Sequence, residues 1–145
     1  QADLKAIDAG VFFGGDPGNP DTLNKMYVDI QMYTNGPEGP NPTSYFQGWV
    51  CEKVNAKANQ WQAGNDGRYC NKDYDALFAQ YTKEFDPAKR KDLAIKLNDT
   101  LVNDVAIIPL INRVTPNGKL KTLDGPTFNT FDSGLWNIQL WKRTG

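Results

Sequence analysis

The strongest constraint on the fold lies in residues 71–113, because the pattern of this stretch predicts two consecutive amphipathic helices. In its first half, apolar side chains recur at the spacing i, i+3, i+4 and i+7: Tyr74, Leu77, Phe78 and Tyr81. This spacing is typical of one face of an α-helix packed against a core. Asp73 can accept hydrogen bonds from the free N–H groups of the first turn. We therefore expect Asp73 to cap this helix.

The second helix has clearer boundaries. Asp86 is a suitable capping residue, and Pro87 follows at the first helical position, where a missing N–H group costs nothing. The apolar stripe then repeats every four residues: Leu93, Leu97 and Leu101. Most charged side chains of this helix lie outside the apolar stripe. The pattern predicts a helix that ends near Asn103–Asp104.

A strand is predicted at residues 27–33. Val28, Ile30 and Met32 alternate with more polar positions, which is the period of a half-buried strand.

Further strands are predicted on either side of the helices. Residues 2–11 alternate weakly, and residues 106–112 form a β-branched apolar run interrupted by Pro109. The motif Pro116-Asn117-Gly118 can close a small hairpin in the tail. Together these elements predict an α/β fold: a mixed sheet with the two helices packed on one face.

Composition excludes several classes of function. The 145 residues suit one domain and carry 16 basic and 17 acidic side chains, with no basic patch, so no nucleic acid is expected as a partner. No apolar run is long enough to span a bilayer. Histidine is absent, which removes the commonest general base and metal ligand. Candidate carboxylate pairs such as Asp73 with Asp75 fall on helix surfaces, so we predict neither an enzyme nor a cofactor.

The loop at residues 12–21 offers side-chain oxygens from Asp16, Asn19 and Asp21. Calcium can bind such a group. The spacing is not that of an EF-hand, however, and Asp and Asn commonly satisfy turns of their own. We favour turns and predict no metal site.

The two cysteines, Cys51 and Cys70, flank a segment rich in Asn and Gly. A disulfide across it would stabilise the fold by about 3 kcal/mol. The alternative is two buried free thiols. An even count fits an oxidising compartment, but two cysteines alone leave both alternatives open.

An ordered set of short motifs runs along the chain: Tyr74-Asp75-Ala76-Leu77-Phe78, Asp86-Pro87-Ala88-Lys89-Arg90 and Ile107-Ile108-Pro109-Leu110. This set resembles the C-terminal region of the family 5 extracytoplasmic solute-binding proteins, which are the dipeptide, oligopeptide and nickel receptors of ABC importers. The resemblance covers most of the chain, and members of that family are several times longer.

The resemblance implies a lobe of a type 2 periplasmic-binding-protein fold, with residues 1–145 as a single domain from a larger two-lobed receptor. Residues 107–145 would cross over to the other lobe and return. A start at Gln1, without a signal peptide, fits a processed product or an excised piece. The implied function is to bind a peptide or similar small polar solute in a cleft between two lobes and deliver it to ABC permease subunits in the membrane. The implied location is extracytoplasmic, which favours the Cys51–Cys70 disulfide.

The expected ligand site follows the predicted strand. In the receptors that this chain resembles, an aromatic-rich turn here faces the ligand, and in peptide receptors an Asp in it holds the peptide's ammonium group. No Asp stands at Thr34-Asn35-Gly36, and Glu38 is the nearest carboxylate. Trp49, on a short helix predicted to begin at Pro42-Thr43-Ser44, either faces the cleft or fills the core; we favour the core but keep it as a site candidate. The predicted ligand-binding residues are Tyr33, Thr34, Asn35, Glu38 and Trp49.

A stand-alone secreted module that binds carbohydrate or another partner is the alternative. It requires a surface row of aromatic rings, to which Trp136 and Trp141 could contribute. A receptor, unlike such a module, would be encoded in a longer reading frame beside a permease gene.

Overall fold

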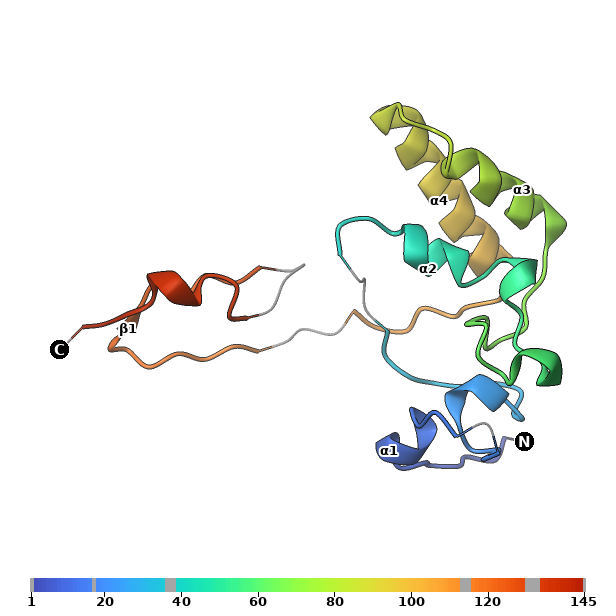
Figure 1. The fold of residues 1–145 in the computed structure, drawn as a ribbon, viewed down its shortest axis with the longest axis horizontal. Helices are drawn as coiled ribbons and strands as arrows, with labels where there is room; N and C mark the ends of the chain where they lie inside the picture. Colours follow the sequence, from blue (N-terminus) through green and yellow to red (C-terminus); the bar gives the residue numbers. More distant parts are fainter. Residues whose placement is uncertain (1, 17, 36–38, 113–115, 130–133, 145) are drawn as a thin grey trace.

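The computed structural model describes residues 2–16, 18–35, 39–112, 116–129 and 134–144. Within these ranges lie four α-helices: α1 Ala9–Phe12, α2 Thr43–Gln47, α3 Lys72–Tyr81 and α4 Pro87–Asn103. They are accompanied by short 3-10 helices: η1 Leu23–Lys25, η2 Cys51–Lys53, η3 Lys57–Asn59 and η4 Ile138–Leu140. The described strands, β1 Leu123–Asp124 and β2 Lys142–Arg143, form an antiparallel pair. The chain is therefore a small protein of mixed α and β structure (Figure 1), in which no described helix is long and apolar enough to cross a membrane.

Helices α3 and α4 form where the sequence predicts them, although one cap differs. Asn71 caps α3, because its side-chain oxygen accepts hydrogen bonds from the N–H groups of Asp73 and Tyr74 at 2.9 and 3.3 Å. The prediction that Asp73 is the cap is therefore wrong; Asp73 lies in the first turn, where its charge still favours the helix dipole. The cap Asp86 is confirmed, since its carboxylate accepts from the N–H group of Lys89 at 2.9 Å.

A small core forms where α2, α3 and α4 meet (Figure 1). Its buried apolar members are Phe46, Val50, Tyr74, Tyr81, Leu97 and Leu101. Burial of one such side chain contributes about 1.5–3 kcal/mol relative to leaving it exposed. The hydroxyl of Tyr74 donates a 2.9 Å hydrogen bond to the carbonyl of Phe46, so the polar end of this buried ring is satisfied. The core thus anchors α2 to the pair α3 and α4.

Arg90 joins the same helices at their polar rim. Its guanidinium lies over the ring of Tyr81, 4.6 Å from the centroid, and donates a 3.0 Å hydrogen bond to the hydroxyl of Thr43. A cation over an aromatic face contributes about 0.5–1 kcal/mol at an exposed site. Arg90 therefore holds the start of α2 against α3 and α4.

The predicted mixed sheet is wrong in its position and extent. Residues 27–33 and 106–112 form no strand, and residues 9–12, at the end of the first predicted strand, are helix α1. A strand requires a neighbouring chain that pairs with its N–H and C=O groups. No described segment pairs with residues 27–33 or 106–112, so alternation alone does not produce a sheet here.

The sheet that does form lies in the tail. It pairs Leu123 with Arg143 and Asp124 with Lys142. These strands are not the arms of a hairpin around Pro116-Asn117-Gly118, and residues 113–115, which would form one arm of that hairpin, lie outside the described residues. The observed pair begins well after the predicted turn.

The chain exposes more surface than a compact protein of its size. Its accessible surface is 11046 Å², whereas a compact monomer of 16.2 kDa exposes roughly 7,500 Å² by the area–mass relation. Val28, Ile30 and Met32 are 50%, 72% and 80% exposed, and the tail extends away from the helices (Figure 1). Within the described chain, the apolar side predicted for residues 27–33 is thus largely uncovered.

Candidate ligand-binding pocket

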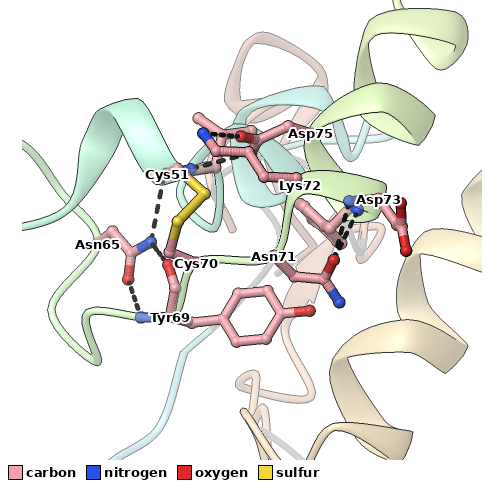
Figure 2. Close-up of polar contacts among 10 residues, drawn as sticks. Cys51, Asn65, Tyr69, Cys70, Asn71, Lys72, Asp73 and Asp75 are labelled. Carbon is pink, nitrogen blue, oxygen red and sulfur yellow. Dashed lines mark hydrogen bonds and ion pairs between the residues drawn. A yellow bond between two sulfur atoms is a disulfide. The ribbon is translucent and has the colours of Figure 1, made fainter.

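Cys51 and Cys70 form a disulfide, so the predicted pairing is confirmed and the free-thiol alternative is wrong. Figure 2 shows the bond beside the first turn of α3. Asp75 of α3 accepts a 3.0 Å hydrogen bond from the N–H group of Cys51 and a 3.2 Å bond from the ammonium of Lys72. The disulfide and Asp75 together attach the loop of residues 51–70 to α3.

Asn65 shapes this loop from inside. It is 1% exposed, and its amide donates to the carbonyls of Val50 and Tyr69 at 3.2 and 2.7 Å. Its side-chain oxygen accepts from the N–H group of Tyr69 at 3.1 Å (Figure 2). One buried side chain therefore holds both ends of the loop, close to the two cysteines.

Asn55 has a similar role on the far side of the loop. Its side-chain oxygen accepts from the N–H groups of Ala63 and Gly64 at 2.7 and 3.0 Å. Its amide donates to the carboxylate of Asp66 at 2.7 Å. These bonds fix the backbone of residues 63–64 and orient the Asp66 side chain.

Arg68 connects the loop to the N-terminal part of the chain. Its backbone adopts a left-handed φ of +53°, and its guanidinium donates to the carbonyls of Lys25, Met26 and Asn55. The guanidinium also lies over the ring of Trp61, 5.0 Å from the centroid. Its donors are thus directed to backbone carbonyls.

A pocket with a volume of about 200 Å³ lies between the loop, α2 and the segment that ends at Asn35. Three of the predicted ligand-binding residues, Tyr33, Asn35 and Trp49, meet in its lining. Thr34 is not among the lining residues, and Glu38 lies outside the described residues. The structure therefore brings together part of the predicted set, and its role in binding stays a prediction.

Sequence reasoning missed six lining residues: Ser44, Tyr45, Gly48, Gly64, Asp66 and Gly67. The first three carried a signal, because positions 44 and 48, and 45 and 49, are four apart and share one side of a helical turn. The last three carried none. Their places depend on the hydrogen bonds of Asn55 and Asn65, which are decided by tertiary structure.

Trp49 contributes to both the core and the pocket, so the two alternatives considered for it are not exclusive. Its ring centroid lies 6.2 Å from that of Tyr45 and 6.4 Å from that of Tyr69, in edge-to-face arrangements. It also packs against the buried core cluster. A ring held on two sides is a rigid wall for a ligand, because little rotamer freedom is left to lose on binding.

The pocket combines neutral phenols with one carboxylate. Burial raises the pKa of both Tyr33 and Tyr45 above its ordinary value, so both phenols stay protonated at neutral pH. Burial also raises the pKa of Asp66 above its ordinary value, and the hydrogen bond from Asn55 and the charge of Arg68 offset this rise only in part. The carboxylate gives one end of the pocket a negative charge.

The pocket therefore offers aromatic faces, hydroxyl and amide groups, and one carboxylate, a set suited to holding a small polar solute. Among the described residues, no three His, Cys, Asp or Glu side chains are grouped so that they could hold a metal ion. Asp16 and Asn19 accept hydrogen bonds from the N–H groups of Gly18 and Asp21 at 2.8 and 3.0 Å. These hydrogen bonds stabilise turns, as expected for this loop.

Trp136 and Trp141 form contacts within the tail. The indole N–H of Trp136 donates to the carbonyl of Thr127 at 2.7 Å, and that of Trp141 donates to the side chain of Asn137 at 2.9 Å. Asn137 is 1% exposed and donates in turn to the carbonyl of Gly125 at 2.7 Å. Both tryptophans thus help to fold the tail.

Comparisons of the chain with protein-family models, with curated proteins and with solved structures give no match. The resemblance to solute-binding proteins therefore rests on the motifs in the sequence. The pocket and the disulfide are observations that stand independently of it.

Proposed function

We propose that this chain is a solute-binding lobe of an ABC importer receptor and belongs to the type 2 periplasmic-binding-protein fold. It would bind a peptide or a similar small polar solute and deliver it to permease subunits in the membrane. The observation that carries the proposal is the pocket in which Tyr33, Asn35 and Trp49 meet. These residues come from segments up to 16 positions apart, and the sequence predicts each of them as a ligand-binding residue.

The mechanism follows from the open form of this pocket. A solute held by Trp49 and the polar groups of one lobe would be covered when a second lobe closes over it, so the ligand would stabilise the closed form. The uncovered apolar side chains Val28, Ile30 and Met32 support a covering partner of this kind. The loaded receptor would then dock on the permease.

The disulfide supports an extracytoplasmic location for the proposed receptor. Disulfides such as Cys51–Cys70 persist in oxidising compartments and are rare in the cytosol. A receptor that captures solute for import works on the outer side of the cell membrane. The oxidised state of Cys51 and Cys70 is therefore consistent with the proposed function.

The proposal is tested by NMR titration of the ¹⁵N-labelled chain with dipeptides, tripeptides and small sugars, up to about 10 mM. Gly48, Gly64 and Gly67 line the pocket, and their amide signals report on its occupation. We expect these signals to shift with at least one solute, with a Kd in the millimolar range, because one lobe covers only part of a ligand. Gly118 and Gly125, in the tail, serve as internal controls.

A pair of matched variants completes the test. Trp49→Ala removes a wall of the pocket and is expected to abolish the shifts, whereas Trp136→Ala, in the tail, leaves them intact. If no solute shifts the pocket glycines, the proposed function is wrong. Micromolar binding by this chain alone would also contradict it, because no second lobe would then be needed.

A further inference from the structure

We propose that the pocket selects organic cations, with an ammonium group held by the carboxylate of Asp66 between the rings of Tyr33, Tyr45 and Trp49. This inference rests on the proposed function, since it names the class of solute. It follows from the charge, the aromatic content and the size of the pocket.

The charge of the pocket is the first argument. Asp66 is the charged member of the described lining, which contains no Lys or Arg. Among the described residues, its carboxylate accepts a hydrogen bond from the neutral amide of Asn55 alone, at 2.7 Å. No ion pair involves it within the described residues. A carboxylate that is partly removed from water and has no cation in contact favours a positively charged ligand.

Arg68 does not fill this role. It is near enough for its charge to favour the ionised form of Asp66. Its guanidinium, however, donates to three backbone carbonyls and lies over the ring of Trp61. Its donors are thus directed away from the carboxylate, which stays open to a ligand.

The aromatic lining is the second argument. The rings of Tyr45 and Trp49 meet at an interplanar angle of 65°, with centroids 6.2 Å apart, so they form two walls of a corner. Tyr33 lines the same pocket, and both phenols remain neutral because burial raises their pKa. Ring faces attract cations through their quadrupole, and the attraction is strongest where water is excluded. Neutral aromatic walls beside one carboxylate are the usual composition of an ammonium site.

The size of the pocket is the third argument. Its volume of about 200 Å³ lies below the range of roughly 300–1,000 Å³ that holds a whole drug-sized ligand. It can therefore take a head group, while the remainder of the solute extends beyond it. A quaternary or primary ammonium group on a short chain meets this limit.

The test compares two probes of nearly equal shape, choline and its uncharged carbon analogue 3,3-dimethylbutan-1-ol. Both are titrated into the ¹⁵N-labelled chain, with the amide signals of Gly64 and Gly67 as the readout. We expect choline to bind about tenfold more tightly, as a cation in a partly desolvated aromatic corner should. We expect this preference to weaken in acid, where Asp66 becomes protonated.

Asp66→Asn is the decisive variant, because it keeps the shape and the Asn55 contact and removes the charge. It should prefer choline clearly less than the wild-type chain does, because only the attraction of the rings remains, whereas Asp16→Asn, in a turn outside the pocket lining, should retain the full preference. The inference is overturned if the wild-type chain does not distinguish the probes, or if Asp66→Asn prefers choline as strongly as the wild-type chain does. In either case, neutral solutes that shift the signals of the pocket glycines would still support the proposed function. If no solute shifts these signals, both the proposed function and this inference are wrong.

Discussion

Replacing Asn65 by alanine is expected to destabilise the protein by about 3 kcal/mol, because three side-chain hydrogen bonds are lost at a site 1% exposed. Each such bond contributes about 1 kcal/mol net. Alanine cannot replace them, and the carbonyls of Val50 and Tyr69 would lose partners that water cannot easily supply. The disulfide remains in place in this variant, so the loss of stability is due to the asparagine side chain alone.

Asn59→Ala is the matched control, since it removes the same side chain from the same loop. Asn59 accepts from the N–H group of Ala56 and donates to the carbonyl of Val54, both at 2.9 Å. It is exposed, so water replaces these bonds and the expected loss is below about 1 kcal/mol. The comparison therefore separates the effect of burial from the effect of bond number.

The assay is urea unfolding followed by tryptophan fluorescence, with hydrogen exchange at the amides of Gly64 and Gly67 as a local measurement. Asn65→Ala should lower the midpoint and increase exchange at both glycines, since the loop that carries them loses its anchor. Equal losses for the two variants, or a loss below about 1 kcal/mol for Asn65→Ala, would refute the claim that buried asparagine bonds organise the pocket loop.

Two further predictions concern the same region. The free energy of unfolding of the double variant Cys51→Ala/Cys70→Ala should be about 3 kcal/mol lower, because the disulfide closes a loop with a sequence separation of 19. A reductant should reproduce this loss in the wild type and have no effect on the variant. An unchanged unfolding midpoint would contradict the entropic argument. Burial, and then the hydrogen bond to Asp104, raise the pKa of Tyr69 to about 12. Because this pKa is higher in the folded state than in the unfolded state, protonated Tyr69 contributes stability that is complete below pH 10.0 and is lost as the pH rises to about 12. Tyr69→Phe lacks this group, so its free energy of unfolding in urea should fall less steeply at alkaline pH.

Local signals predicted the helical part of the fold. The apolar stripe of α4, the cap Asp86 and the proline after it determine its start and end within a few residues of chain. The predicted cap of α3, Asp73, is wrong because Asn caps helices as well as Asp does, and Asn71 stands two positions earlier. Only the backbone geometry at Asn71, which is extended, distinguishes them.

Strands could not be predicted in the same way. The alternation of Val28, Ile30 and Met32 describes which side of an extended chain would be buried, but it does not supply the neighbouring strand. Pairing partners lie at arbitrary distances along the sequence, as the pair of Leu123 with Arg143 shows. A sheet is therefore a property of the whole chain and not of one segment.

The sequence by itself predicted helices α3 and α4, and the resemblance favoured the pairing of Cys51 with Cys70 and named three residues that line the candidate pocket. These depend on spacing along the chain or on a resemblance carried by short motifs. Tertiary structure decided the rest of the pocket: Asp66 reaches it because Asn55 and Asn65 fold the loop inward. Their amides find partners up to 31 positions away, and no local pattern encodes such contacts, because buried and exposed asparagines in a loop look alike in sequence.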